Sequence, residues 1–189
     1  MARKRLDRVR ARHLGAAAVL VLIVSVVAAL GGEAVYVHPQ VDAPRRADAV
    51  LILGGPEHER YPFGLALGRE GFASTVVVSN PDGPRNRWLT NECENPPPGI
   101  VVHCFKPDPS TTKGEGRELR RLASEHGWKT VIVVTIRPHI SRARYVLQSC
   151  FDGDLVMVPS PTNLSVAEWA YQYLYQTGGY ARAVLEPGC

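Results

Sequence analysis

Residues 131–144 constrain the fold of this chain more than any other stretch. They begin with the run Val-Ile-Val-Val, and four β-branched apolar residues in a row are typical of a strand buried on both faces. A polar turn follows, and Pro138 suits the first turn of a helix, where its missing N–H costs nothing. His139 and Arg142 then stand at the start of that helix. Strand, turn and helix in this order place both side chains at the carboxyl end of the strand, where open α/β sheets bind ligands.

The same alternation of a short apolar run and a helical pattern extends along most of the chain. Further strands are expected at residues 49–53, 75–78, 100–105 and 154–158, and further helices at residues 59–71, 113–126 and from 165 onward. Such an alternation with short connections predicts a Rossmann-like α/β fold, in which five parallel strands in the order 3-2-1-4-5 have helices on both faces.

Two segments of this pattern have features of their own. Residues 81–99 are polar and rich in proline, which predicts a long loop or a small excursion from the fold. The final helix is expected to begin with a capping box formed by Ser165 and Glu168 and to end at Gly178 and Gly179.

The first 36 residues have the pattern of an export signal. Residues 1–13 are basic, and in residues 14–30 the hydroxyl of Ser25 is the only side-chain polar group. A signal-peptide core has about 7–15 apolar residues and a spanning helix needs roughly 17–25, so the length favours an uncleaved transmembrane anchor. Cleavage after Ala34 is the alternative.

The predicted organisation follows from this anchor. Residues 1–13 would form a cytoplasmic basic segment, residues 14–36 the transmembrane signal anchor and residues 37–47 an extended linker. Residues 48–189 would then form an extracytoplasmic domain of a single-pass protein of the cell membrane.

The net charge of +4 is concentrated in the first twelve residues, which hold six basic side chains and one acidic one. The rest of the chain has 16 basic and 17 acidic residues. A nucleic-acid footprint requires Lys and Arg clustered on the folded domain, so nucleic acid is not an expected partner.

The four cysteines are an even number in a chain with an export signal, so disulfide bonds are expected. Three connectivities are possible. We favour Cys93–Cys104, which would hold the proline-rich loop, and Cys150–Cys189, which would fix the last residue to the end of a helix. No Cys-x-x-Cys spacing is present, and no metal site is expected.

Polar residues follow each of the first four predicted strands and should meet at one edge of the sheet. Arginine forks, hydroxyls and helix N-termini are the groups that recognise phosphate or pyrophosphate. A neighbouring His and Glu could transfer protons. The candidate ligand-binding residues are Gly54, Gly55, Arg60, Ser79, Thr112, Thr135, Arg137 and Arg142, and the candidate catalytic residues are Glu115 and His139.

Each of these residues also has a plain structural interpretation. Glu115 lies three residues after Thr112 and could complete a capping box. His139 could cap or pack at a helix start, and Arg142 could lie on a solvated helix face. The prediction of an anion site therefore depends on the convergence of the set.

Four segments of the chain resemble the YdcF-like domain family, to which bacterial envelope proteins of the SanA and ElyC type belong. They are Ala-Asp-Ala-Val-Leu-Ile-Leu-Gly-Gly at 47–55, Val-Val-Val-Ser at 76–79, Ser-Thr-Thr with Glu115 at 110–115, and Val-Thr with His-Ile-Ser-Arg-Ala at 134–143. Family members often carry Glu-Asn where this chain has Glu115-Gly116, and its cysteines are not part of the family pattern.

The resemblance implies a Rossmann-like fold and a role in cell-envelope biogenesis or integrity, in peptidoglycan or lipid-carrier metabolism. It implies no settled reaction and no known cofactor. The domain would be either an enzyme that hydrolyses or transfers a phosphate ester or pyrophosphate of an envelope precursor, or a non-catalytic module that binds or scaffolds envelope components. Binding of a nucleotide or S-adenosylmethionine is a third possibility that the family implies.

Overall fold

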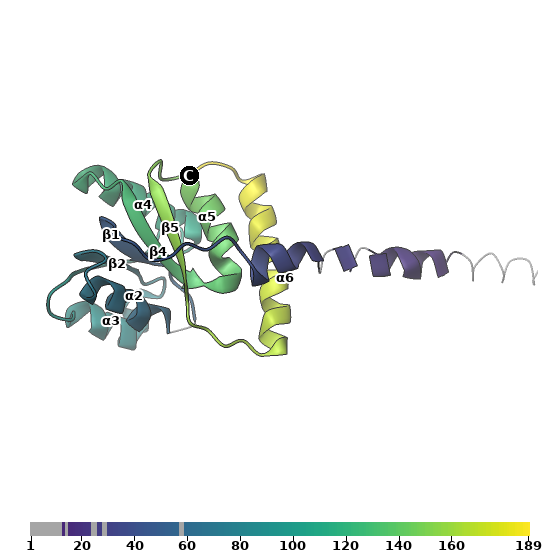
Figure 1. Ribbon diagram of the computed structural model, residues 1–189, viewed down its shortest axis with the longest axis horizontal. Helices are drawn as coiled ribbons and strands as arrows, with labels where there is room; N and C mark the ends of the chain where they lie inside the picture. Colours follow the sequence, from purple (N-terminus) through teal and green to yellow (C-terminus); the bar gives the residue numbers. More distant parts are fainter. Residues whose placement is uncertain (1–12, 14, 24–25, 28–29, 57–58) are drawn as a thin grey trace, which may run out of the picture.

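Five parallel strands form a single sheet in the order β3-β2-β1-β4-β5 in this computed structural model, which describes residues 13, 15–23, 26–27, 30–56 and 59–189 (Figure 1). The strands are β1 (Ala49–Ile52), β2 (Thr75–Ser79), β3 (Val101–Phe105), β4 (Thr130–Ile136) and β5 (Asp154–Ser160). The predicted Rossmann-like sheet and its strand order are therefore confirmed.

The central strands are buried on both faces, as their continuous apolar runs require. Leu51 of β1 pairs with Val133 of β4, and both side chains lie in the core on one face of the sheet. Val50 and Ile132, one residue earlier in each strand, pair with each other and lie in the core on the opposite face. The period of two along a strand thus fills two separate cores.

Helices cover both faces of the sheet. They are α2 (Arg60–Arg69), α3 (Arg87–Glu94), α4 (Thr112–His126), α5 (Ile140–Gln148) and α6 (Val166–Leu185). Leu119 of α4 and Leu147 of α5 enter one core, while Leu65 of α2 and Leu89 of α3 enter the other. The first turns of α2, α4 and α5 consequently stand at the carboxyl edge of the sheet.

The proline-rich excursion contains a helix that its composition did not predict. Asn86 caps α3 because its side-chain oxygen accepts a hydrogen bond from the backbone N–H of Leu89, which is buried. The predicted Cys93–Cys104 bond is present and joins α3 to β3. The predicted Cys150–Cys189 bond is present as well.

Helix α6 is longer than predicted. Its capping box at Ser165 and Glu168 is confirmed, but the helix continues through Gly178 and Gly179 to Leu185. A Cβ atom at Gly179 would lie 3.0 Å from the Cδ and Nε atoms of Arg142. This glycine therefore allows a close approach to Arg142 instead of ending the helix.

The predicted N-terminal transmembrane helix is wrong. Among the described residues, no helix is long and apolar enough to cross a membrane. Helical turns occupy residues 15–23, 26–27 and 30–32 and are succeeded by a π-helical segment, Glu33–Val37. Residues 1–12, 14, 24–25 and 28–29, on which parts of the predicted basic segment and anchor fall, lie outside the described residues.

Residues 42–45, within the predicted linker, lie along the edge of β5 (Figure 1). The backbone N–H of Asp42 donates to the carbonyl of Met157, and the N–H of Met157 donates to the Asp42 carboxylate at 2.8 Å. Arg144 of α5 binds the same carboxylate at 2.8 Å, and Arg45 pairs with Asp154. The segment therefore covers an edge strand that would otherwise present unpaired backbone groups.

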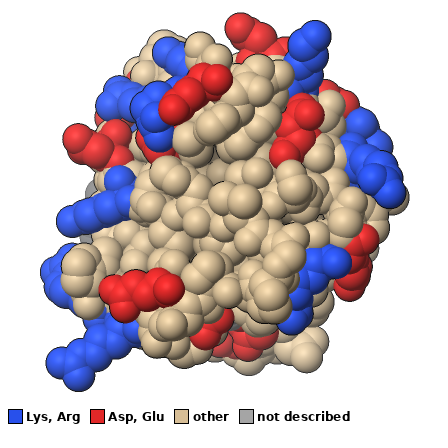
Figure 2. All heavy atoms as spheres, turned by 90° about the vertical axis from the view of Figure 1, so that its left-hand side faces the viewer, with Lys and Arg blue, Asp and Glu red and all other residues tan. Residues whose placement is uncertain are grey.

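Charges of both signs are interspersed on the face of the molecule opposite α6. Figure 2 shows blue and red side chains around a mostly uncharged centre on this face. The clustered cations of the domain lie elsewhere, in a cleft beside α6.

Candidate functional site

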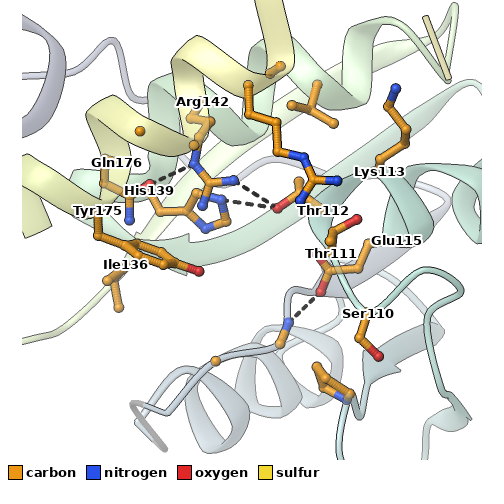
Figure 3. A pocket seen from close by; sticks show the side chains of 18 of the residues that line it. Ser110, Thr111, Thr112, Lys113, Glu115, Ile136, His139, Arg142, Tyr175 and Gln176 are labelled. Carbon is orange, nitrogen blue, oxygen red and sulfur yellow. Dashed lines mark hydrogen bonds between the residues drawn. The ribbon is translucent and has the colours of Figure 1, made fainter. Parts of the chain in front are cut away.

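A cleft of about 830 Å³ lies at the carboxyl edge of the sheet. Its floor is formed by the turn after β1, the N-termini of α2 and α4, and the start of α5, and one face of α6 forms its wall (Figure 3). The predicted site residues Gly54, Gly55, Arg60, Thr112, Glu115, His139 and Arg142 all line this cleft. Four segments that are far apart in the sequence thus meet at one place.

Glu115 lies in the first turn of α4 and is only 3% exposed. Its Oε1 atom accepts a hydrogen bond of 2.6 Å from the backbone N–H of Gly54 (Figure 3). It makes this contact across the cleft and does not complete a capping box. Burial raises the pKa of Glu115, although the Gly54 N–H, the Ser79 hydroxyl and the arginines Arg60 and Arg142 oppose the rise.

Ser79 lies beneath the floor of the cleft and does not line it. The side chain is fully buried, and its hydroxyl lies against Glu115 and lowers the pKa of that carboxyl group. Among the described residues it nevertheless meets no partner with good hydrogen-bond geometry. Ser79 therefore belongs to the support of Glu115 rather than to the ligand-contacting surface.

Arg60 begins α2 and is only 2% exposed. Its Nη1 atom donates to the carbonyls of Gly54 at 3.0 Å and Leu53 at 3.3 Å. A Cβ atom at Gly55 would lie 2.6 Å from the guanidinium nitrogens, so only glycine leaves room for this side chain. The Gly-Gly turn therefore holds a buried cation at the cleft and is more than an ordinary tight turn.

The imidazole of His139 is held by a hydroxyl on each side. Its Nδ1 atom lies 2.9 Å from Thr135 Oγ1, and its Nε2 atom lies 3.3 Å from Thr112 Oγ1. Burial lowers the pKa of His139 well below its usual value, and the charges of Arg142 and Arg60 lower it further. At neutral pH the ring is therefore uncharged, and both of its nitrogens have partners.

Arg142 connects three helices at the cleft. Its Nε atom donates to Gln176 of α6 at 2.8 Å, and Nη1 donates to Thr112 of α4 at 3.4 Å (Figure 3). The guanidinium carbon lies 5.8 Å from the ring centroid of Tyr175. Burial lowers the pKa of Arg142. The predicted alternative of a solvated helix face is thus wrong, because these contacts fix the orientation of the guanidinium group.

The N-terminus of α4 adds hydroxyl groups and backbone donors to the cleft. Ser110, Thr111 and Thr112 line it in succession where the helix begins. The first N–H groups of a helix have no partners within the helix, and the helix dipole favours an anion at this end. This arrangement suits an oxyanion with several acceptor atoms.

Two predicted site residues lie outside the cleft. Thr135 is completely buried and acts on the cleft only through its contact with His139. Arg137 is exposed and does not line the cleft. It begins the short 3-10 segment Arg137–His139, in which Pro138 and His139 are buried while the side chain of Arg137 remains at the surface.

The sequence interpretation missed the wall that α6 contributes. The residues of this helix that line the cleft are Tyr171, Gln172, Leu174, Tyr175, Gln176, Gly178, Gly179, Arg182, Ala183 and Glu186. Gln172 and Gln176 are buried, and Gln176 donates to Gln172 at 2.8 Å. One sequence signal could have revealed this wall. Gln172 and Gln176 are four residues apart, so they lie on one face of the helix, where two buried amides can be hydrogen-bond partners.

The arrangement suits recognition of an anion. Five cationic side chains line the cleft, against the carboxylates of Glu115 and Glu186: they are Arg60, Lys113, Arg117, Arg142 and Arg182. Among the described residues, no group of His, Cys, Asp and Glu side chains is placed to hold a metal ion.

The cleft and sheet define a Rossmann-like α/β domain with a cationic site at its carboxyl edge. No known protein family matches this chain in a comparison with family descriptions, and no curated protein matches it either.

Proposed function

We propose that this protein binds a phosphorylated small molecule in the cleft at the carboxyl edge of its sheet. The observation that carries this proposal is the pair of guanidinium groups of Arg60, which is buried, and Arg142, which is partly buried, beside the hydroxyl-rich N-terminus of α4. Guanidinium forks, hydroxyls and helix N–H groups together match the many acceptor oxygens of a phosphate group. Burial of the cations strengthens their attraction for an anion.

The setting that we propose is an oxidising compartment. Two disulfide bonds that involve all four cysteines support it, because such bonds persist outside the reducing cytosol. The resemblance to envelope proteins adds the candidate ligand, a phosphorylated precursor of cell-envelope biogenesis.

Titration calorimetry with inorganic phosphate tests the proposal. Arg142→Ala should weaken phosphate binding by at least tenfold, because one charge-assisted contact is worth about 1.5–3 kcal/mol. Arg137→Ala is the matched control, since this arginine lies five positions earlier and is exposed outside the cleft. Phosphate binding of wild-type strength by a folded Arg142→Ala would refute the proposal. Should Arg142→Ala fail to fold, Arg142→Lys decides, because it keeps the charge but loses the oriented fork.

Hydrolysis of a phosphate monoester is the second candidate function, and the position of Glu115 favours it. A carboxylate with a raised pKa that contacts the cleft could take a proton from an attacking water molecule. The water oxygen would bond to phosphorus as the bond from phosphorus to the ester oxygen breaks, the departing alkoxide would gain a proton from solvent, and Glu115 would later release its proton to solvent. Phosphate release from p-nitrophenyl phosphate by the wild type but not by Glu115→Gln would support this reaction, and no release from either would leave binding alone.

A further inference from the structure

The cleft is much larger than a phosphate group. Its volume of about 830 Å³ lies in the range of pockets that hold whole organic molecules, roughly 300–1,000 Å³. Arg60, Arg142 and the α4 N-terminus account for only part of its lining. The wall along α6 is therefore available to the rest of the ligand, and its chemistry indicates what that part is.

The part of the wall that residues 169–181 form is uncharged and aromatic. Residues 169–181 include one tryptophan and four tyrosines and contain no charged side chain. Tyr171, Leu174 and Tyr175 line the cleft and are 60%, 78% and 55% exposed. The rings of Tyr171 and Tyr175 stack on each other with centroids 5.6 Å apart. Large apolar side chains are thus presented to the cleft instead of to the core.

The polarity of α6 is inverted relative to an ordinary surface helix. Its buried residues are Gln172 and Gln176, while Tyr171, Tyr175 and both of its leucines are largely exposed. The glutamine amides are engaged with each other and with Arg142. The glutamines therefore line the cleft where they orient the guanidinium group of Arg142, and the exposed tyrosines and Leu174 line its remaining wall.

Tyr175 stands where the two halves of the cleft meet. Its ring lies beside the guanidinium group of Arg142 at 5.8 Å, so a phosphate bound by Arg142 would have its ester oxygen near this ring. Beyond it, a Cβ atom at Gly178 would meet nothing within 4 Å, which keeps the wall open. An organic group attached to the phosphate would therefore extend along the apolar side of α6.

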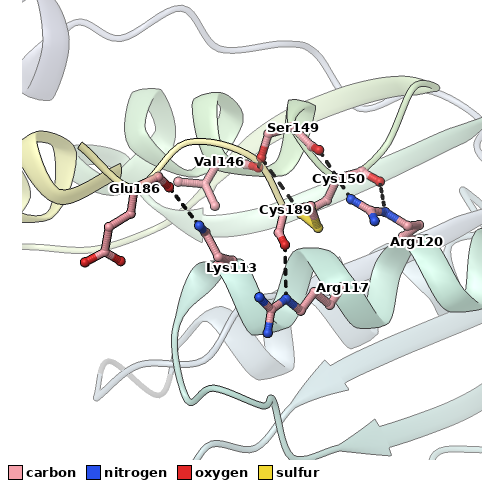
Figure 4. The surroundings of a disulfide bond; sticks show 8 residues. All are labelled: Lys113, Arg117, Arg120, Val146, Ser149, Cys150, Glu186 and Cys189. Atoms are coloured by element: carbon pink, nitrogen blue, oxygen red, sulfur yellow. Dashed lines mark hydrogen bonds between the residues drawn. A yellow bond between two sulfur atoms is a disulfide. The ribbon is translucent and has the colours of Figure 1, made fainter. Parts of the chain in front are cut away.

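Cations at the far end of the cleft are already engaged, which argues against a second phosphate there. Lys113 donates to the carbonyl of Glu186 at 2.7 Å, and Arg117 donates to the carbonyl of Cys189 at 3.2 Å (Figure 4). Arg182 pairs with the carboxylate of Glu186 at 3.1 Å. Arg60 and Arg142 have hydrogen-bond partners of their own, but they are less exposed than Arg117 and Arg182, and we therefore place the phosphate group beside them.

We infer that the ligand is a phosphate monoester with an uncharged, predominantly apolar organic group that packs on Tyr171, Leu174 and Tyr175. This inference rests on the proposed function, because it places the phosphate group at Arg142. A second phosphate group would compete with the contacts that Lys113, Arg117 and Arg182 already make, and an apolar organic group would gain from burial against the aromatic side chains.

Three probes and one matched pair of variants test the inference by calorimetry. The probes are inorganic phosphate, glycerol 3-phosphate and phenyl phosphate. We expect phenyl phosphate to bind the wild type about tenfold more tightly than glycerol 3-phosphate, the effect of burying roughly 55 Å² of apolar surface. Leu174→Ser should remove most of this preference and leave the affinity for inorganic phosphate unchanged.

Leu185→Ser is the control, because Leu185 is on the same helix, is 81% exposed and does not line the cleft. This variant should retain the full preference for phenyl phosphate. Equal affinities for the two esters, or equal effects of both leucine substitutions, would overturn the inference while phosphate binding still stood. Absence of phosphate binding to the wild type would instead contradict the proposed function itself.

Discussion

The buried imidazole of His139 should make the stability of the domain depend on pH. Burial and two arginines hold its pKa well below the usual value near 6.5. Below about pH 6.5 the unfolded chain takes up a proton that the folded domain excludes, so stability present above this pH is lost on acidification. Urea unfolding at pH 7.5 and 5.5 should show that the free energy of unfolding falls less between these two pH values for His139→Gln than for the wild type.

The exposed His126 provides the control for this experiment. The free energy of unfolding of His126→Gln should fall between pH 7.5 and 5.5 by as much as that of the wild type, because the His126 side chain is exposed and not part of the buried hydrogen-bond network. If the free energy of unfolding fell equally on acidification in His139→Gln and the wild type, the assignment of His139 as an uncharged group that positions Thr112 would be wrong.

Glu115 should give the opposite pH dependence. Burial raises its pKa, so the folded domain holds a proton in a range of pH where the unfolded chain has released it. The stability linked to this proton is present at acid pH and is lost as the pH rises through the raised value. Glu115→Gln keeps an acceptor for the N–H of Gly54 and removes the charge. Its melting temperature should therefore exceed that of the wild type by more at pH 8 than at pH 5. A difference in melting temperature that is smaller at pH 8 than at pH 5 would contradict this prediction.

At the residue scale, the sequence could predict which side chains meet but not every direction in which they point. Arg60, Glu115 and Arg142 follow different strands, and the carboxyl ends of parallel strands share one edge. Arg137 follows the same strand as Arg142 but lies outside the cleft, because one residue in a tight 3-10 turn decides whether a side chain points inward. No spacing rule fixes that direction in advance.

At the scale of elements, α6 should control the orientation of Arg142. Gln176→Ala removes the acceptor of the Arg142 Nε–H and the partner of Gln172. We expect a loss of about 1–3 kcal/mol in the free energy of unfolding, typical of a buried polar group left without a partner. Phosphate affinity should fall about three- to tenfold, because the guanidinium group is no longer fixed.

Tyr173 offers a comparison on the same helix, since it packs against Tyr36 rather than against the cleft. Tyr173→Ala should lower the melting temperature without a selective loss of phosphate affinity. If Gln176→Ala bound phosphate as tightly as the wild type, orientation by α6 would have no part in binding.

The elements differ in how far the sequence could predict them. Short, mainly apolar runs predict strands from local sequence alone, and the five strands lie where those runs occur. Helix α3 was missed because Asn86 and Leu89 are a cap and a core contact in a polar, proline-rich segment. Helix α6 continues through Gly178 and Gly179, and the close approach of Gly179 to Arg142 is a tertiary contact that local helix propensity does not predict.

At the scale of the whole molecule, residues 42–45 should stabilise the domain by covering the edge of β5. Asp42→Ala removes the acceptor for the N–H of Met157 and for Arg144. Urea unfolding should show a loss of about 1–2 kcal/mol in the free energy of unfolding. The hydrogen bond from the Met157 N–H should account for more of this loss than the partly exposed ion pair with Arg144. Asp152→Ala, an exposed acidic residue without such a contact in the described structure, should leave stability nearly unchanged. Equal stability of Asp42→Ala and the wild type would mean that this segment lies on the domain without holding it.

The two disulfide bonds should contribute unequally to the stability of the whole chain. In the chain-entropy treatment the gain grows with the length of the closed loop, and the separations are 11 residues for Cys93–Cys104 and 39 for Cys150–Cys189. The estimates are roughly 3 and 4 kcal/mol. The longer loop also joins the C-terminal end, beyond α6, to the end of α5, beside the carbonyls that Lys113 and Arg117 bind (Figure 4).

Paired serine substitutions separate the two contributions. The Cys150→Ser, Cys189→Ser variant should lose more unfolding free energy than the Cys93→Ser, Cys104→Ser variant. It alone should also weaken phosphate binding, because release of the chain end frees the helix that holds Arg142 through Gln176. Cys93–Cys104 joins α3 to β3, so removal of this bond should lower stability without moving α6, which forms the cleft wall. A larger stability loss from the shorter loop would show that strain or residual structure in the unfolded chain outweighs loop length, and equal effects on phosphate binding would separate α6 from control of the site.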